Sequence, residues 1–333
     1  MTAPPILSVE HLTTVFDLAS GPGPAVIDVG FDLFPGQTLG IVGESGSGKS
    51  VTAYSILRLV QPPGRVAGGR VWFQGRDLLQ LSDREMRSVR GAGIGFVFQE
   101  PMAALNPVMT VGRQIAEALE VHGRSGDSRR RTIELLDAVQ IADSRHRVDE
   151  YPHQLSGGMR QRVMIAIALA CQPSLVIADE PTTSLDVTIQ AEILDLLKRM
   201  KQDLGLALVL ITHDLGVVAG TADNVVVMYA GRVVERGPTR DLLRNPQHPY
   251  TRALVESLPR SGHGARLRSI EGAVPAIGAV PSGCAFHPRC RDRFEPCSTA
   301  VPPEYSLGPG RSAACYLHDP AVTVARALVD ATD

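Results

Sequence analysis

One glycine-rich stretch, residues 43–50 (Gly-Glu-Ser-Gly-Ser-Gly-Lys-Ser), limits the possible folds of this 333-residue chain more than any other feature. An apolar run, 38–42, precedes it, and residues 51–57 have the composition of a helix. A strand, a glycine-rich turn and a helix that begins at Lys-Ser form a phosphate-binding loop, because backbone N–H groups and the positive end of the helix dipole then face one anion. The sequence therefore predicts an α/β fold with a nucleotide bound at this turn, the P-loop.

Each position of the P-loop has an expected role at that nucleotide. Lys49 is expected to reach the β- and γ-phosphates, and the Ser50 hydroxyl is expected to hold Mg²⁺. The other residues of this region that we expect to bind the nucleotide are Gly43, Ser45, Gly46, Gly48 and Val51. A glycine-rich loop without a ligand is the alternative, and the flanking strand and helix make it the weaker one.

The composition is that of a globular chain, with 44% hydrophobic and 20% charged residues, and its length suggests about two domains. A net charge of −2 gives no reason to expect nucleic acid as the main partner. No apolar run approaches the ~18–20 residues of a membrane span, and the first residues lack a secretory signal. We therefore expect a cytoplasmic protein, which can still bind a membrane protein.

Three apolar runs that read as buried strands are each followed by a polar side chain. Gln99 follows 94–98, Asp179 and Glu180 end 175–180, and His213 follows 206–211. Since strands alternate with helices here, we expect a mostly parallel sheet whose carboxyl ends lie along one edge, next to the P-loop. A capped strand end or a surface polar group is the commoner explanation for each residue alone, and their joint occurrence favours a site.

Phosphoryl transfer needs charge neutralisation and an aligned nucleophile more than covalent chemistry from the protein. Asp179 is the natural residue to orient Mg²⁺ and its waters. Glu180 is the natural base for a water that attacks the γ-phosphate.

With these motifs in place, the sequence resembles the ATPase subunits of ABC transporters over roughly residues 5–255. Six motifs match in order and spacing: Walker A (43–50), Q-loop (Gln99), signature (155–158), Walker B (175–180), D-loop (184–186) and H-loop (His213). The resemblance implies a P-loop NTPase of ABC type, with a RecA-like core, an antiparallel β subdomain and a helical subdomain at about 100–170. ATP and Mg²⁺ would be its cofactors.

The same resemblance implies a head-to-tail dimer in which ATP lies between the P-loop of one subunit and the signature of a second ATPase subunit. Residues of the signature that would serve the partner's nucleotide are Ser156, Gly157 and Gly158, and Asp186 of the D-loop joins the predicted nucleotide site. Phe16 would stack on adenine. Gln99 would join the Mg²⁺ ligands and the catalytic residues, and His213 would contact the γ-phosphate and help align Glu180.

The finer resemblance is to the ATPases of oligopeptide/dipeptide importers, and four segments support it: 98–107, 179–188, 248–254 and 283–290. It implies a peripheral protein on the cytoplasmic face of the cell membrane, paired with two transmembrane permeases and an extracytoplasmic peptide-binding protein. The loop after Gln99 and the helical insertion would receive a permease coupling helix. The alternatives are an importer ATPase for nickel or another small solute, a soluble ABC-type ATPase acting on DNA or ribosomes, and a metal-sensing regulator.

A composition change after Leu258 divides the chain into an ATPase domain, 1–258, and a C-terminal extension, 259–333. The extension is expected to be a small, irregular metal-binding domain, because it has little core of its own and holds Cys284, Cys290, Cys297 and Cys315. The spacing Cys-x5-Cys-x6-Cys-x17-Cys is neither a zinc ribbon nor a ferredoxin pattern. Chemistry alone favours zinc, and it leaves an iron–sulfur cluster and a metal-free thiol cluster as alternatives.

The importer resemblance implies a [4Fe-4S] cluster on these four thiols, with zinc as the alternative. Its role would be structural or redox-regulatory and not catalytic in ATP hydrolysis. His287 and His318 are alternative ligands.

Overall fold

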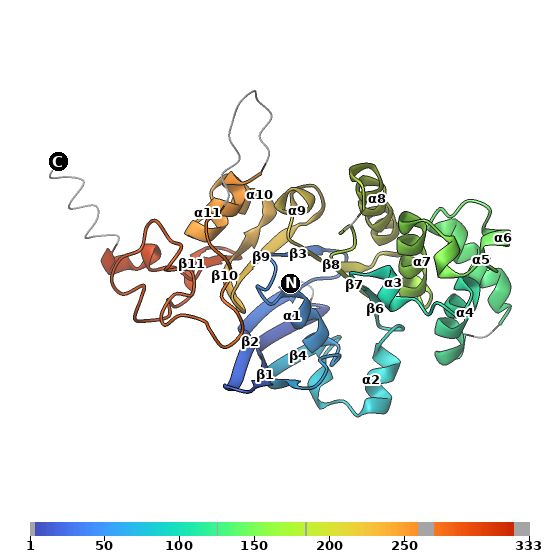
Figure 1. The fold of residues 1–333 in the computed structure, drawn as a ribbon, viewed down its shortest axis with the longest axis horizontal. Coiled ribbons are helices and arrows are strands. Elements are labelled where there is room, and N and C mark those ends of the chain that lie inside the picture. Colours follow the sequence, from blue (N-terminus) through green and yellow to red (C-terminus); the bar gives the residue numbers. More distant parts are fainter. Residues whose placement is uncertain (1–3, 125, 184, 259–269, 323–333) are drawn as a thin grey trace, which may run out of the picture. The chain divides into compact units, whose positions relative to one another are not determined.

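The computed structural model describes residues 4–124, 126–183, 185–258 and 270–322. They divide into two compact units, and Figure 1 labels most of their helices and strands. Unit 1 comprises the residues up to Ser8 together with 32–38 and 71–211. Unit 2 comprises 9–31, 39–70 and the residues after 211. None of the described helices is both long and apolar enough to cross a membrane.

Unit 1 contains a buried parallel sheet made of β6 (Ile94–Val97), β7 (Leu175–Asp179) and β8 (Ala207–Thr212). Leu175 of β7 pairs with Ile94 on one side and with Ala207 on the other. Every residue of β7 and β8 is buried. A strand covered on both faces needs a nearly continuous apolar sequence, and these runs supply it. The strands predicted from apolar runs are therefore parallel neighbours, as expected.

Helices make up most of the remainder of unit 1. α4 (Val111–Val121) and α5 (Ser128–Ala138) pack against α7 (Gly157–Leu169), and α7 also contacts α8 (Val187–Leu204). Each of these four helices begins after a residue whose side-chain oxygen accepts a backbone N–H of the first turn: Thr110, Asp127, Ser156 and Asp186. Such caps satisfy N–H groups that would otherwise have no partner in the helix. The shorter elements are β5 (Arg76–Asp77), η1 (Leu78–Gln80), α2 (Asp83–Val89), α3 (Pro101–Ala104), α6 (Ser144–Arg147) and η2 (Pro152–Gln154).

Unit 2 contains the second group of strands. β3 (Thr38–Val42) pairs in parallel with β9 (Asn224–Tyr229), and β9 forms an antiparallel hairpin with β10 (Arg232–Pro238). Ala230 and Gly231 form the turn of this hairpin. A separate sheet contains β1 (Leu7–Leu18), β2 (Gly21–Leu33) and β4 (Gly64–Phe73), in the order β2-β1-β4. The helices of unit 2 are α1 (Lys49–Ile56), α9 (Leu215–Thr221), α10 (Thr239–Arg244), α11 (Pro249–Glu256) and η3 (Tyr316–His318).

The C-terminal extension is less irregular than its composition suggests. Its strands β11 (Tyr305–Gly308) and β12 (Arg311–Ala313) form a hairpin, and β12 pairs with β10, with Ala313 opposite Glu235. Phe286 of the extension is 2% exposed and belongs to the same hydrophobic core as Tyr229 and Tyr250. The described part of the extension therefore belongs to unit 2 and shares its hydrophobic core with α11 and β9 of that unit.

Candidate functional site

The P-loop connects β3 to α1, as the sequence predicts, and two of its glycines are required by the backbone. Gly43 and Gly48 have φ of 156° and 101°. A Cβ at Gly43 would lie 2.3 Å from the carbonyl oxygen of Met228, and one at Gly48 would lie 2.6 Å from that of Ala25. Glycine relieves both the torsional strain and the overlap. Gly46, with φ of 81°, faces open space.

The Lys49 ammonium lies inside the turn of the P-loop. Its side chain is almost fully buried, and Nζ donates to the carbonyl oxygens of Gly43 at 2.8 Å and Glu44 at 3.0 Å. Lys49 and Ser50 are the first two residues of α1, where the helix dipole favours an anion. One turn and the start of one helix thus hold all the residues predicted around the phosphates: Gly43, Ser45, Gly46, Gly48, Lys49, Ser50 and Val51.

In unit 1, two of the predicted catalytic side chains meet at the carboxyl edge of the sheet. Gln99, which follows β6, donates from Nε2 to Oε2 of Glu180 over 3.3 Å. Thr183 donates from Oγ1 to the same carboxylate oxygen at 2.8 Å. Glu180 is 9% exposed and has a positive φ of 44°, an uncommon conformation for this residue type. The carboxylate is therefore held by two donors, and it stands on a backbone conformation that costs energy.

Asp179 and His213 lie at the carboxyl ends of two strands: Asp179 ends β7, and His213 follows β8. Asp179, the last residue of β7, is completely buried and pairs in register with Ile211 of β8. His213 lies two residues further along the chain and is exposed. The buried carboxylate of Asp179 suits a group that binds a divalent cation through oxygen.

The residues predicted to serve a second subunit's nucleotide lie at two helix starts in unit 1. Ser156 caps α7 by accepting from the backbone N–H of Met159 at 3.3 Å, and both Ser156 and Gly157 are exposed. Gly158 follows in the first turn of α7. Asp186 caps α8 and is also exposed. Ser184 of the D-loop lies outside the described residues.

Phe16, predicted to stack on adenine, lies in β1 of unit 2 and is half-buried. A Cβ on Gly64 would lie only 2.6 Å from Cε1 of Phe16. The ring therefore packs directly over a glycine backbone, and a larger residue at position 64 would displace it.

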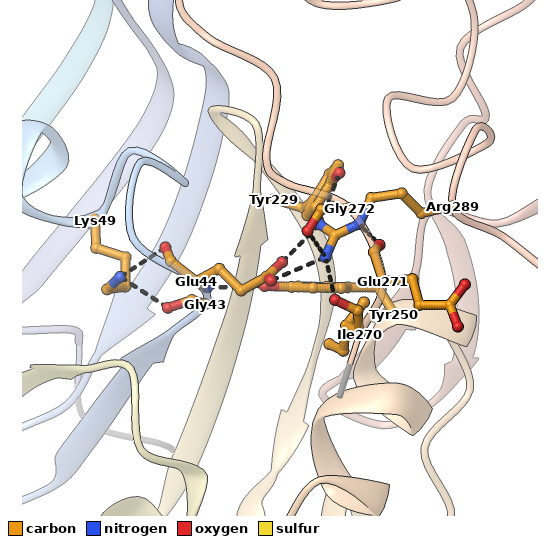
Figure 2. Close-up of polar contacts among 9 residues, drawn as sticks. All are labelled: Gly43, Glu44, Lys49, Tyr229, Tyr250, Ile270, Glu271, Gly272 and Arg289. Carbon is orange, nitrogen blue, oxygen red and sulfur yellow. Dashed lines mark hydrogen bonds and ion pairs between the residues drawn. The ribbon is translucent and has the colours of Figure 1, made fainter. Parts of the chain in front are cut away.

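Three residues of this region, Glu44 in the P-loop and Tyr250 and Arg289 beside it, are not among those predicted from the sequence. Glu44 places a carboxylate in a turn built for anions, and the structure pairs it with Arg289 of the extension at 2.8 Å. The Glu44 backbone N–H donates to the hydroxyl of Tyr250 at 2.8 Å. The signal available in the sequence was the carboxylate of Glu44 itself. A negative charge in a turn that binds phosphate is favourable only if a cation lies beside it. Figure 2 shows these contacts.

The four extension cysteines line one pocket in unit 2. His287 lines it too, while His318 bonds through Nε2 to the Gln247 carbonyl oxygen at 3.2 Å. Burial raises the pKa of Cys290 to about 11 and that of Cys315 to about 12, and it also raises the pKa of Cys284. Among the residues that the structure describes, no three His, Cys, Asp or Glu side chains are arranged to hold a metal ion. Four thiols are suitable ligands for a metal such as zinc or iron. In the described residues, however, they are not arranged in a coordination geometry.

A shallow groove lies on the helical part of unit 1. Its lining includes Pro107, Val108, Asp149, Tyr151 and His153. Val108 is 79% exposed, and the rings of Tyr151 and His153 stack with centroids 5.7 Å apart. An apolar side chain that is so exposed beside stacked rings suits contact with another protein.

The chain is similar to two family models. Residues 26–183 match the model described as ABC transporter, and residues 234–297 match the one described as the C-terminal region of oligopeptide/dipeptide transporters. Relatives include a putative peptide import ATP-binding protein of Brucella ovis, 49% identical over 332 residues (95% of this chain, 98% of the relative). The dipeptide transport ATP-binding protein of Bacillus subtilis is 48% identical over 318 residues (94% and 95%), and the oligopeptide transport ATP-binding protein of Salmonella typhimurium is 48% identical over 314 (93% and 93%).

Solved structures agree on the fold. The dimeric post-hydrolysis state of an ATP-binding cassette bound to ADP and Pi matches with a TM-score of 0.64 at 29% identity, covering 70% of this chain and 99% of that one. A component of an ABC transporter complex from Clostridium perfringens matches with a TM-score of 0.62 at 29% identity, covering 73% and 92%. The P-loop fold predicted from the sequence is thus confirmed as that of an ABC ATPase cassette. The chain belongs to the ATP-binding subunits of ABC transporters, in the oligopeptide/dipeptide transporter family, and its enzymatic activity is that of an ATPase.

Proposed function

We propose that this chain is the ATP-hydrolysing motor of an importer for oligopeptides or dipeptides. The observation that carries the peptide assignment is the match of residues 234–297 to the C-terminal region of oligopeptide/dipeptide transporters. Relatives at 48–49% identity, aligned over nearly their whole length, bear peptide transport names. ATP binding would close a head-to-tail ATPase dimer and drive the permeases, and hydrolysis would reset it.

In the proposed reaction, the residues of the P-loop bind the phosphates, and Phe16 stacks on adenine. Ser50, Gln99 and Asp179 would hold Mg²⁺, which neutralises phosphate charge when bound. Glu180 takes a proton from the attacking water, whose oxygen forms a bond to the γ-phosphorus. The bond from that phosphorus to the β–γ bridging oxygen breaks, and ADP and phosphate leave. The contacts from Gln99 and Thr183 support Glu180 as the base, because they keep its carboxylate in one orientation.

His213 is proposed to contact the γ-phosphate. Ser156, Gly157 and Gly158, with Asp186, are proposed to complete the nucleotide site of a second ATPase subunit, an identical copy or a paralogue. The exposure of Ser156, Gly157 and Asp186 in the single chain supports this role, since a group that serves another subunit must be reachable.

Two transmembrane permeases are the proposed partners, with the chain peripheral on the cytoplasmic face of the membrane. The groove beside Val108 and Tyr151 is the proposed docking site for a permease coupling helix. An extracytoplasmic peptide-binding protein would join through the permeases. Nucleic acid is not a proposed partner.

The proposed domain organisation is an ATPase domain, 1–258, with a helical subdomain at about 100–170, and an extension, 259–333. The extension is proposed to bind a [4Fe-4S] cluster through Cys284, Cys290, Cys297 and Cys315, with zinc as the alternative. Four thiols in one pocket support a metal centre. Iron and sulfide in anaerobically purified protein would favour the cluster, and a colourless protein with stoichiometric zinc would favour zinc.

The test is reconstitution of the ATPase pair with its permeases and binding protein in vesicles, with ATP supplied on the side of the ATPases. We expect labelled peptide to accumulate only with ATP, and peptide to stimulate ATP hydrolysis. Uptake of nickel but not peptide would overturn the peptide assignment. Stable co-purification with nucleic acid or ribosomes, without permeases, would favour the soluble ATPase alternative.

A further inference from the structure

The guanidinium of Arg289 in the C-terminal extension uses all five of its N–H donors (Figure 2). Nη1 and Nη2 donate to the two carboxylate oxygens of Glu44 at 2.8 and 3.0 Å. The other donors contact the Tyr229 hydroxyl at 3.2 Å and the carbonyl oxygens of residues 270–272 at 2.8–3.3 Å. The Arg289 side chain is only 7% exposed and that of Glu44 is 28% exposed, so the guanidinium side of this bidentate ion pair is shielded from solvent.

Three contacts fix the conformation of Glu44 in the P-loop. Its N–H donates to Oη of Tyr250, its carbonyl oxygen accepts from Nζ of Lys49, and its carboxylate is held by Arg289. Tyr250 is fully buried, so its hydroxyl is a fixed acceptor. The peptide planes on both sides of Glu44, and with them the position of the Lys49 ammonium, therefore depend on residues more than 200 positions away in the chain.

The charge of Glu44 matters as much as its position. A lone carboxylate in this turn would repel a phosphate and compete with it for Lys49. An arginine guanidinium is charged throughout the ordinary pH range, and both of its Nη groups donate to the carboxylate of Glu44. Arg289 thus neutralises the only carboxylate of the P-loop, whose side chain extends from the turn toward the extension (Figure 2).

A short, packed turn holds Arg289 in place. The Arg289 N–H donates to the Phe286 carbonyl oxygen at 3.0 Å, and the Phe286 ring packs against Tyr229 and Tyr250 with centroids 5.2 and 5.3 Å apart. Those two tyrosines also contact Arg289 and Glu44, respectively. The turn is therefore preorganised against the P-loop.

We propose that Arg289 is a positioning residue for nucleotide binding, which neutralises Glu44 and holds the P-loop open for phosphate. Arg289 acts through Glu44 and does not itself touch the nucleotide. The proposal deepens the function of the established ATPase and is independent of the transported solute and of any metal on the cysteines.

The test measures ATP affinity and steady-state kinetics on the full chain. We expect Arg289→Ala to weaken ATP binding about tenfold, the scale of one uncompensated charge near a phosphate, and to raise KM while kcat changes less than about twofold. Glu44→Gln added to Arg289→Ala should restore most of the affinity, because the repelling charge is gone. A role of Arg289 confined to folding the extension predicts no such rescue.

The matched control is Arg252→Ala, which breaks an exposed ion pair between α11 and Asp292 of the extension and should leave ATP affinity unchanged. If Arg289→Ala does not fold, the same comparison is made between Arg289→Lys alone and Arg289→Lys combined with Glu44→Gln. Lysine cannot make the bidentate contact with the carboxylate. Wild-type affinity in the Arg289 variant, or a double variant no better than the single one, would overturn the proposal.

Discussion

The side-chain amide of Gln99 donates a hydrogen bond to the carboxylate of Glu180 across two neighbouring parallel strands, with 3.3 Å between Nε2 and Oε2. The register of β6 and β7 creates this contact, because both residues follow the carboxyl ends of their strands. Thr183 adds a second, shorter contact to the same oxygen. The proposed catalytic base is therefore oriented by two side chains.

Replacing Glu180 by Gln tests its proposed role as the base. Turnover should fall by about 10²–10⁴, the usual contribution of a positioned acid or base, while ATP binding is retained. Phosphate release and ATP titration measure the two quantities. Glu134→Gln, which changes an exposed carboxylate on α5, is the control. Near-normal turnover in Glu180→Gln would show that another group takes the proton.

Replacing Thr183 by Val tests whether the base needs orientation. The change removes the 2.8 Å donor to Glu180 at nearly constant volume, and a lost hydrogen bond to a charged group is worth about 1.5–3 kcal/mol. We expect kcat to fall by about tenfold or more with little change in ATP affinity. Thr183→Ser keeps the hydroxyl and should retain most of the activity. Equal rates in the Val and Ser variants would contradict the orienting role.

Two alanine substitutions in the P-loop separate overlap from torsional strain. Gly48→Ala would bring a Cβ within 2.6 Å of the Ala25 carbonyl oxygen, whereas Gly46→Ala meets no atom within 4 Å, and both glycines have positive φ. Gly46→Ala should lower the free energy of unfolding by about 1 kcal/mol, and Gly48→Ala should lower it further. Urea unfolding measures both changes. Equal stability of the two variants would show that the P-loop relaxes around the new Cβ.

Glu235 joins the extension hairpin to the start of α11, and its carboxylate is completely buried. It accepts from the N–H groups of Gln247 and His248 and pairs with Arg311 at 3.4 Å. Glu235→Gln would turn an amide NH₂ toward these donors and leave Arg311 without its counter-charge, so the free energy of unfolding should fall by about 3 kcal/mol. Chemical denaturation measures this change. The control is Asp292→Asn, which breaks the exposed ion pair with Arg252 and should lower the free energy of unfolding by less than about 1 kcal/mol. Similar losses of stability in the two variants would show that burial does not decide the effect.

Substitution of single cysteines tests the metal assignment. Cys284→Ser should lower the metal content per chain measured by elemental analysis, because one of the four pocket thiols is lost. Cys171→Ser is the control, since this buried thiol donates to the Ala118 carbonyl oxygen and does not line the pocket. Unchanged metal content in Cys284→Ser, or equal loss in both variants, would contradict binding by the extension cysteines.

The meeting of Gln99 and Glu180 was predictable, because apolar runs of strand length, alternating with helices, imply parallel neighbours whose ends coincide. The close spacing of the four cysteines in the chain likewise indicated that they lie together. The hairpin of β11 and β12 was not predictable, because its strands are only four and three residues long and β12 is held by pairing with β10, which lies far away in the sequence.

The sequence by itself determined the class of this protein and the form of its P-loop. Gly43 and Gly48, the apolar run before them and the Lys-Ser at the helix start act through neighbours in the chain, and local conformation follows from such neighbours. Only the tertiary structure decided that Arg289 pairs with Glu44, 245 residues away. An ion pair between distant segments leaves no periodic pattern, because its geometry depends on how Phe286 and the two tyrosines pack.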